Sequence, residues 1–274
     1  MSANTFNPML RGIVGKVLPV GVRLALKRWL GKYLYMGRSA PTSYGCEIIG
    51  DDVQPELLRG WQDPLVAERQ EAAFAPLLRQ MREGRPREDF VALAAAVRLT
   101  GAEDPLIVEV GCGSAWNSEV LAHLWKRPFR YVGVDYSQAM LSLANRQYPQ
   151  RPLVAGDATA LPFRDKACDI LLYGTVLMHL LGYHKAMQES RRVARKWCIF
   201  HTVPVAVNRP TTILKKFAYG RSVVEVVFNA DEFQTLLDTY GLRLREVVKS
   251  IPHEYLSEVL CETITARTYL CEVA

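Results

Sequence analysis

The sequence feature that most constrains the fold is the stretch 105–135, PLIVEVGCGSAWNSEVLAHLWKRPFRYVGVD. Its apolar run at 106–110 is typical of a strand that is buried on both faces of a parallel sheet. Gly111 and Gly113 then permit a sharp turn and the close approach of a ligand to the backbone. A segment of helical spacing follows, and a second apolar run ends at Asp135. The stretch therefore predicts a strand–turn–helix–strand unit with a ligand site at its turn.

The same stretch indicates which ligands suit the turn. Ser114 or Asn117 could cap the helix, whose free N–H groups favour an electron-rich ligand. Asp135 can accept two hydrogen bonds from a ribose diol. The dinucleotide fingerprint needs a third glycine three residues after the second, and Trp116 stands there, where it would crowd a pyrophosphate. No phosphate loop of the Walker type is present, so the sequence favours a nucleoside-type ligand without a pyrophosphate.

The length and charge of the chain limit its organisation. With 274 residues, one catalytic domain and an appended segment are the natural count. Residues 1–40 hold seven Lys or Arg and no Asp or Glu, whereas the remainder holds 27 basic and 28 acidic residues. The net charge of +6 thus belongs to the N-terminal arm. This distribution is weak support for a nucleic-acid-binding body.

The cysteine pattern argues against metal and disulfide chemistry. The six cysteines form no C-x-x-C pair and no His/Cys cluster at zinc spacing; they are Cys46, Cys112, Cys168, Cys198, Cys261 and Cys271. We expect buried, reduced thiols, which suit a cytoplasmic compartment, and no metal.

The basic N-terminal arm, residues 1–40, contains an amphipathic stretch at 10–35 that Pro19 divides. It lacks an uncharged apolar run of about 18 residues, so we expect no spanning helix. Three alternatives remain open: adsorption to an anionic membrane at the inner face, docking on the domain's own surface, or a mitochondrial presequence. The first would make the protein peripheral to the membrane.

Residues 41–104 are predicted to form a helical cap or linker. Residues 41–60 have no sustained period and indicate a loop. Asp63 is expected to cap a helix that starts at Pro64, and a second helix is expected at about 86–99. Three side chains of this segment could reach the cofactor or substrate, although we favour surface or packing roles for them: Trp61, Gln62 and Gln70.

The remaining sequence, 105–274, continues the alternation of strands and helices. Expected strands are 152–155, 168–173, 197–200, 242–248 and 266–273, with helices capped by Ser137 and Asn229. Residues 205–228, rich in basic, aromatic and β-branched side chains, are predicted to form an insertion or lid over the sheet.

Three motifs in register give a specific resemblance over 106–181. EVGCGSA is followed by VGVD and then by GDATALPFRDKACDILLYGTVLMHL. Together they resemble the class I S-adenosylmethionine-dependent methyltransferases, in their type 11 branch that acts on quinones and small molecules. The chain departs from that pattern at Ala115, usually glycine, at Cys168, usually aromatic, and at Arg195-Lys196, often a glycine pair.

The resemblance implies an α/β fold: a seven-stranded, Rossmann-like, mostly parallel sheet with an antiparallel last strand, helices on both faces and an N-terminal helical extension. It also implies S-adenosyl-L-methionine as cofactor, with Asp157 and Ala158 at the adenine and Tyr173 and Gly174 beside the methionyl part. The cofactor-binding residues expected from this match are Glu109, Gly111, Cys112, Gly113, Asp135, Tyr136, Asp157, Ala158, Tyr173 and Gly174.

Methyl transfer needs a general base only for a weakly acidic acceptor. His179, His201 and Tyr173 are the catalytic candidates by position, and a packing role is the alternative for each histidine. The segment after strand 168–173 lacks the Asn/Asp-Pro-Pro-aromatic loop of enzymes that methylate base amines, and no twin-glutamate loop of arginine methyltransferases occurs. We therefore expect a small-molecule or lipid-linked acceptor and no nucleic acid. The alternative function is a non-catalytic cofactor-binding or membrane-associated module of the same fold.

Overall fold

The computed structural model describes residues 43–50 and 53–274. The amphipathic stretch predicted at 10–35 lies outside the described residues. Among the described residues, no helix combines the length and the hydropathy needed to cross a bilayer.

The predicted seven-stranded sheet is present. Its strands in spatial order are β4 (Leu153–Ala155), β3 (Arg130–Asp135), β2 (Leu106–Val110), β5 (Cys168–Gly174), β6 (Ala194–Ala206), β10 (Thr265–Val273) and β9 (Leu242–Pro252). The first five are parallel, and β10 runs antiparallel between β6 and β9. The predicted fold class is confirmed.

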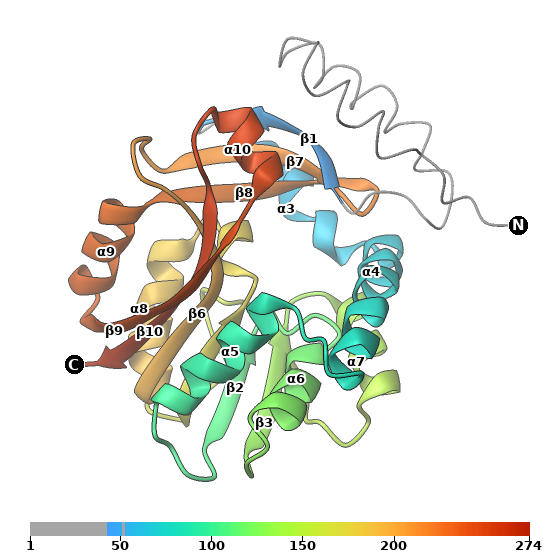
Figure 1. Cartoon of the computed structure of the whole chain (residues 1–274), viewed down its shortest axis with the longest axis vertical. Helices are drawn as coiled ribbons and strands as arrows, with labels where there is room; N and C mark the ends of the chain where they lie inside the picture. The colour runs from blue at the N-terminus through green and yellow to red at the C-terminus, as the bar shows by residue number, and fades with distance from the viewer. Residues whose placement is uncertain (1–42, 51–52) are drawn as a thin grey trace, which may run out of the picture.

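Helices cover both faces of this sheet, as Figure 1 shows. On one face, α8 (Tyr183–Val193) and α9 (Ala230–Thr239) contribute Met187 and Phe233 to a large apolar cluster. On the other, α5 (Glu88–Leu99) and α6 (Trp116–Leu124) contribute Phe90 and Leu121 to a second cluster. α7 (Gln138–Gln147) follows β3. Neighbouring residues of β2 join different clusters, Ile107 the second and Val108 the first. This explains the uninterrupted apolar run of that strand.

Three of the predicted helix caps are confirmed, and one is wrong. Asp63 caps α4 (Pro64–Arg82), while Ser137 and Asn229 cap α7 and α9 through side-chain oxygens that accept backbone N–H groups. The N-cap residue of α6 is instead Ala115, which has a left-handed φ of 63° and makes no side-chain cap. Ser114 and Asn117 are engaged elsewhere, because their side chains donate to Glu71 and Glu109.

Three further strands extend the sheet to ten and correct the prediction for two segments. β1 (Ser43–Ile48) pairs antiparallel with β7 (Thr212–Ala218), which pairs antiparallel with β8 (Arg221–Asn229). The loop expected at 41–60 thus contains a strand, together with α3 (Pro55–Leu58) and the 3₁₀ helix η1 (Gly60–Gln62). β1 and β7 lie far apart in the chain, and such non-local pairing leaves little local signal.

The segment 205–228 is therefore more than a covering loop. We call β7 and β8 the outer hairpin; it joins the main sheet where Val205 and Ala206 of β6 pair in parallel with Phe228 and Asn229. Together with β1 and α10 (Glu254–Leu260), it forms the upper part of the molecule in Figure 1. β6 is accordingly longer than the predicted strand at 197–200, because it pairs with β5, β8 and β10 along its length.

Candidate cofactor and acceptor site

One cavity of about 270 Å³ lies at the carboxyl ends of the parallel strands. This is where open α/β sheets bind their ligands. Its walls come from four segments: the turn after β2, the ends of β3 and β4, the end of β5 with the following 3₁₀ helix η2 (Leu177–His179), and the residues before β2. The lining residues are Leu58, Trp61, Gln70, Val110, Gly111, Gly113, Trp116, Asp135, Tyr136, Met140, Gly156, Asp157, Ala158, Gly174, Thr175, Val176, His179, Leu180, Leu181 and Gly182.

The glycine turn after β2 has the shape that its sequence predicts. Gly111 and Gly113 adopt left-handed φ values of 65° and 55°. A Cβ at Gly111 would lie 2.3 Å from the Cβ of Val176, so no side chain fits there. A Cβ at Gly113 would lie 3.6 Å from the side chains of Gln70 and Trp116, which also line the cavity. The turn thus leaves room for a ligand that lies against its backbone.

Asp135 ends β3 at the cavity wall and holds the turn in place. Its two oxygens accept from the backbone N–H groups of Gly113 and Ser137, each at 2.8 Å. Burial raises the pKa of this carboxyl above its usual range, against the opposing effect of those hydrogen bonds. Each oxygen keeps a second lone pair, so the carboxylate can still accept hydroxyl donors such as those of a ribose.

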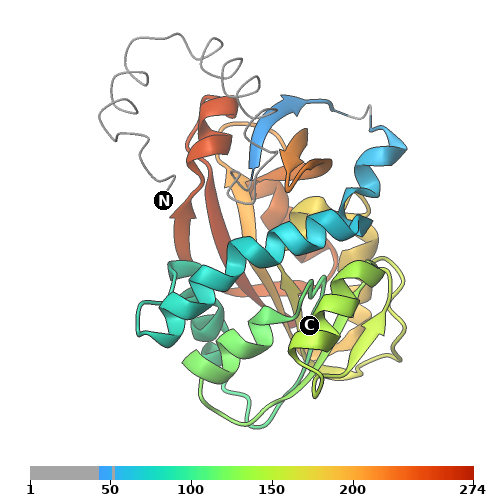
Figure 2. The same cartoon turned by 90° about the vertical axis from the view of Figure 1, so that its right-hand side faces the viewer.

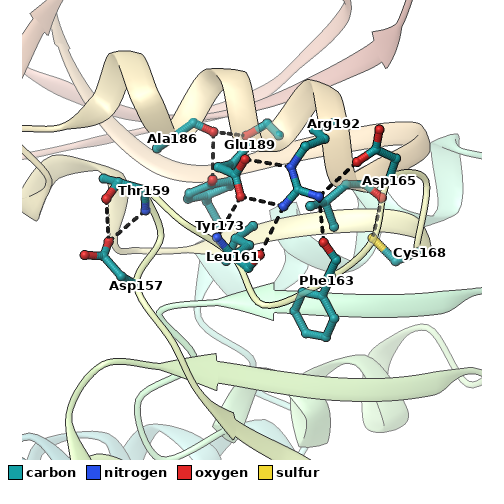
Figure 3. Close-up of polar contacts among 12 residues, drawn as sticks. Asp157, Thr159, Leu161, Phe163, Asp165, Cys168, Tyr173, Ala186, Glu189 and Arg192 are labelled. Carbon is teal, nitrogen blue, oxygen red and sulfur yellow. Dashed lines mark hydrogen bonds and ion pairs between the residues drawn. The ribbon is translucent and has the colours of Figure 1, made fainter.

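Asp157 and Ala158 line the cavity on the loop after β4. One oxygen of Asp157 accepts from the backbone N–H of Thr159 at 2.7 Å and from its hydroxyl at 2.8 Å, as Figure 3 shows. The other oxygen is available to a ligand donor such as an exocyclic amine.

A network of hydrogen bonds and ion pairs around Arg192 of α8 holds the same loop. No sequence pattern indicated this network. The guanidinium of Arg192 donates to the carbonyls of Leu161 and Phe163 and to the carboxylates of Glu189 and Asp165. Glu189 in turn accepts from the backbone N–H of Leu161 at 2.7 Å. Figure 3 shows this network to the right of Asp157 and Thr159. It fixes the loop, and with it the backbone N–H of Ala158, relative to the sheet.

The ten predicted cofactor-binding residues divide into two groups. Seven line the cavity: Gly111, Gly113, Asp135, Tyr136, Asp157, Ala158 and Gly174. Three are not among its lining residues: Glu109, Cys112 and Tyr173. Burial raises the pKa of the Cys112 thiol, which makes it a poor nucleophile.

Glu109 is fully buried and supports the site from below the turn. Its carboxylate accepts from Asn117 at 2.6 Å and from the hydroxyl of Tyr131. Its Oε1 atom lies so close to the backbone of Gly174 that a Cβ there would be 2.0 Å away. Burial raises the pKa of Glu109 to about 7, so this group exchanges a proton near neutral pH. The structure therefore gives Glu109 a bracing position between β2, β3 and β5.

Of the three catalytic candidates, the structure places only His179 at the cavity. The hydroxyl of Tyr173 donates to the carbonyl of Ala186 at 3.0 Å, so this side chain is directed toward α8 (Figure 3). His201 lies inside β6, 2% exposed, with its Nδ1 atom 2.8 Å from the hydroxyl of Thr268. The prediction put His201 at the mouth of a short strand; the greater length of β6 instead places it within the sheet.

A strap made of residues 53–82 covers the cavity and supplies side chains that sequence patterns left undecided. Trp61 and Gln70 line the cavity, whereas Gln62 is exposed to solvent. In Figure 2, α4 crosses the molecule between the outer hairpin and the helices α6 and α7. The hydroxyl of Tyr136 donates to the carbonyl of Leu58 at 3.1 Å. The strap is thereby attached to the cavity edge.

The sequence matches a known family in its central part. Residues 108–200 match the family model described as "Methyltransferase domain". A probable S-adenosylmethionine-dependent methyltransferase of Mycolicibacterium smegmatis is 26% identical over 167 residues, or 59% of this chain and 60% of the relative. A demethylmenaquinone methyltransferase of Renibacterium salmoninarum is 33% identical over 89 residues, or 32% of this chain and 36% of the relative. The chain therefore spans less than two thirds of the length of these relatives.

Solved structures agree with the fold. The chain is similar to a 1,6-didemethyltoxoflavin-N1-methyltransferase of Burkholderia thailandensis, solved with 1,6-didemethyltoxoflavin and S-adenosylhomocysteine bound. The TM-score is 0.53 at 14% identity, and the match covers 85% of this chain and all of that one, 100%. At this identity the likeness concerns the fold alone.

Proposed function

We propose that this chain, a class I methyltransferase by fold and by family, transfers a methyl group from S-adenosylmethionine to a small-molecule or lipid-linked acceptor. The observation that supports this best is a cavity that joins two kinds of wall. Gly113, Asp135 and Asp157 suit the nucleoside of the cofactor, and His179 lies opposite an aromatic side chain of the strap.

The lining residues fit S-adenosylmethionine, which is the cofactor that the fold and the relatives indicate. Asp135 would accept from the ribose hydroxyls, and Asp157 with Ala158 would hold the adenine edge. The glycine turn would lie against the methionyl part. When bound, this cofactor supplies a methyl group on a sulfonium sulfur, a leaving group that needs no further activation. The protein's task is then to align the acceptor and to exclude water.

The acceptor wall of the cavity, formed by the strap and by the residues that follow β5, favours an uncharged molecule. No lysine or arginine occurs among the described residues that line the cavity. The basic residues of the outer hairpin, which could have attracted an anion, lie next to carboxylates: Lys215 with Glu47, Lys216 with Glu225, and Arg221 with Asp63. At the cavity edge, Leu58 and Tyr136 expose 45% and 39% of their surface. This apolar rim suits an acceptor with hydrophobic parts.

His179 is our candidate for a general base. Its Nδ1–H donates to the carbonyl of Val224 at 2.7 Å, which leaves the lone pair on Nε2. Burial lowers the pKa of His179 to about 4, with a smaller opposing effect from Glu225. The imidazole is therefore neutral at physiological pH and can accept a proton from an acceptor hydroxyl. Because a base of this pKa is weak, its action needs a nearby acceptor proton that becomes acidic as the methyl group arrives.

Two measurements on the full chain test the proposal. Calorimetry with S-adenosylmethionine and with S-adenosylhomocysteine should show binding of both; no binding of either would overturn the assignment. Incubation with methyl-labelled cofactor and a cell extract should then place label in the small-molecule or lipid fraction. Binding without any transfer would favour the non-catalytic module instead.

The role of His179 is tested by the change His179→Asn, with His184→Asn as the matched control. His184 is exposed, and its Nδ1 atom lies 3.1 Å from the hydroxyl of Tyr240. General-base catalysis typically contributes about 10²- to 10⁴-fold, so His179→Asn should lower the transfer rate by at least about 100-fold. The control should leave it unchanged. Equal rates for both variants would eliminate His179 as the base.

A further inference from the structure

One polar side chain of the cavity has no hydrogen-bond partner among residues 43–50 and 53–274. It belongs to Gln70 of α4, which is half-buried and lines the cavity. Its Oε1 atom lies against the glycine turn, because a Cβ added at Gly113 would be 3.6 Å from it. A carboxamide offers two N–H donors and one acceptor oxygen. Gln70 therefore leaves these groups to a ligand that lies beside the turn.

Two contacts between α4 and the segment of the glycine turn hold Gln70 in this place. The hydroxyl of Ser114 donates to the carboxylate of Glu71, the next residue of the helix, at 2.5 Å. One helical turn beyond Gln70, on the same face of α4, the ring of Phe74 stacks on the ring of Trp116. The centroids of these rings are 4.0 Å apart. The backbone of α4 is thus fixed at Gln70, which lowers the entropy cost of a contact with a ligand.

The charges of the cavity indicate which ligand group suits this amide. Asp135 and Asp157 are carboxylates, and no Lys or Arg lines the cavity in the part of the chain that the structure describes. S-adenosylmethionine carries two positive groups, the sulfonium and the ammonium, and one negative group, the carboxylate. An acidic wall attracts the positive groups, whereas the carboxylate finds no cation there and needs neutral donors. The amide of Gln70 is such a donor, and it lies where the glycine turn would meet the methionyl part.

We propose that Gln70 donates an N–H group to the carboxylate of the cofactor's amino-acid end and so completes the cofactor site from the strap. This inference rests on the proposed function. It adds a binding residue from outside the segment 108–200 that matches the family model. The strap also carries Leu58 and Trp61 of the cavity lining, so the same contact would connect the acceptor wall to the bound cofactor.

A ligand without the carboxylate isolates the proposed contact. Decarboxylated S-adenosylmethionine keeps the nucleoside, the sulfonium and the amine. The change Gln70→Met keeps the length of the side chain and removes the amide. In calorimetry on the full chain, we expect Gln70→Met to lower the affinity for S-adenosylmethionine roughly 10- to 100-fold, because the lost hydrogen bond has a charged acceptor. The affinity for the decarboxylated ligand should stay the same.

The change Gln70→Glu gives the two ligands opposite responses. It keeps the shape of the side chain and puts a negative charge beside the carboxylate of the cofactor. It should therefore lower the affinity for S-adenosylmethionine more than Gln70→Met does. It should raise the affinity for the decarboxylated ligand, whose end group is a cation. A general loosening of α4 cannot produce opposite responses, and this variant decides the question if Gln70→Met fails to fold.

The matched control is Gln80→Met, because Gln80 is exposed on the same helix and is not a lining residue of the cavity. It should bind both ligands like the wild type. The proposal would be overturned by the same loss in this control, or by parallel changes for the two ligands in Gln70→Met or Gln70→Glu. Unchanged affinity for S-adenosylmethionine with a raised KM for the extracted acceptor would also overturn it, since Gln70 would then contact the acceptor. Failure of the wild-type chain to bind S-adenosylmethionine would instead refute the proposed function.

Discussion

The two walls of the cavity are built in different ways. The nucleoside wall, residues 106–158, comes from one continuous stretch of chain. It presents the glycine turn, two carboxylates and the side chains of Trp116, Tyr136 and Met140. The acceptor wall combines the strap, the residues after β5 with η2, and the backbone of the outer hairpin, where the carbonyl of Val224 holds His179. The first wall is rigid because it belongs to the main sheet. The second is assembled from segments that lie far apart in the chain.

The largest expected effect on stability is at Gly174, the last residue of β5. It packs against two buried side chains of the nucleoside wall. A Cβ there would lie 2.0 Å from Oε1 of Glu109 and 2.8 Å from Nδ2 of Asn117, both buried. Neither group can move without losing its hydrogen bond. We expect Gly174→Ala to lower the free energy of unfolding by at least about 3 kcal/mol, measured by urea denaturation.

The matched variant on the other wall is Gly60→Ala in the strap. Its Cβ would lie 2.6 Å from the carbonyl oxygen of Ser222 and 2.7 Å from a methyl group of Val223. Because the strap can shift away from the hairpin as a unit, we expect a smaller loss of stability, below about 2 kcal/mol, and a loss of transfer activity. If the two alanine variants lost equal stability, the contrast between a rigid and an adaptable wall would be broken.

The second prediction concerns the buried brace of the rigid wall. The folded pKa of Glu109 is about 7 against an ordinary value of 4.5, so the folded state keeps a proton that the unfolded chain releases. The free energy of unfolding should therefore fall as pH rises from 4.5 to 7, by roughly 3 kcal/mol. Glu109→Gln cannot ionise and should remove this fall. Urea midpoints of both proteins at pH 5 and pH 8 provide the measurement; parallel pH dependence in the two would contradict the assignment.

The same contrast explains how much of the molecule could be predicted from the sequence. The nucleoside wall could be predicted because its signals are local: glycines at a strand end, a carboxylate at the next one, and a cap such as Ser137. Of the acceptor wall, the start of α4 and the candidate His179 were predicted, but the strands of the outer hairpin were not. β1 was assigned to a loop, since its strand pairing with β7 depends on residues far along the chain.

Single residues of the site were harder to predict than its outline. Glu109 belongs to the turn motif by sequence, yet β2 directs its side chain beneath the turn, to Asn117 and Tyr131. Thr175 and Thr202 carry no motif, although both have left-handed backbone angles and their hydroxyls are hydrogen-bonded to each other. Sequence patterns report which residues follow a strand; they do not report where a side chain points.

The third prediction compares the two carboxylates of the nucleoside wall. Asp135→Asn replaces an oxygen that accepts a backbone N–H with an amide nitrogen that cannot, and it removes the charge that would hold the ribose hydroxyls. We expect the affinity for S-adenosylmethionine to fall roughly 10- to 100-fold, or about 2 kcal/mol. Asp157 is exposed, so Asp157→Asn should cost less than about tenfold. Calorimetry measures both, and a larger loss at Asp157 would reverse the order that burial predicts.

The smallest expected effect is at Ala115, the position where the sequence departs from the motif that it resembles. Its left-handed φ of 63° costs about 1–2 kcal/mol for a residue with a Cβ, so Ala115→Gly should release that strain. The same methyl group is fully buried against Tyr131 and Ala144, and its loss costs about 0.8 kcal/mol. The greater freedom of glycine in the unfolded chain offsets a further part of the gain, about 0.4–1 kcal/mol. We therefore expect the free energy of unfolding to change by less than about 1 kcal/mol and the cofactor affinity to stay the same.

A change larger than this in either direction would show that strain and packing do not balance at this residue. A balance explains why alanine is tolerated here, whereas at Gly111, where a Cβ would meet Val176 at 2.3 Å, no packing gain could offset the clash.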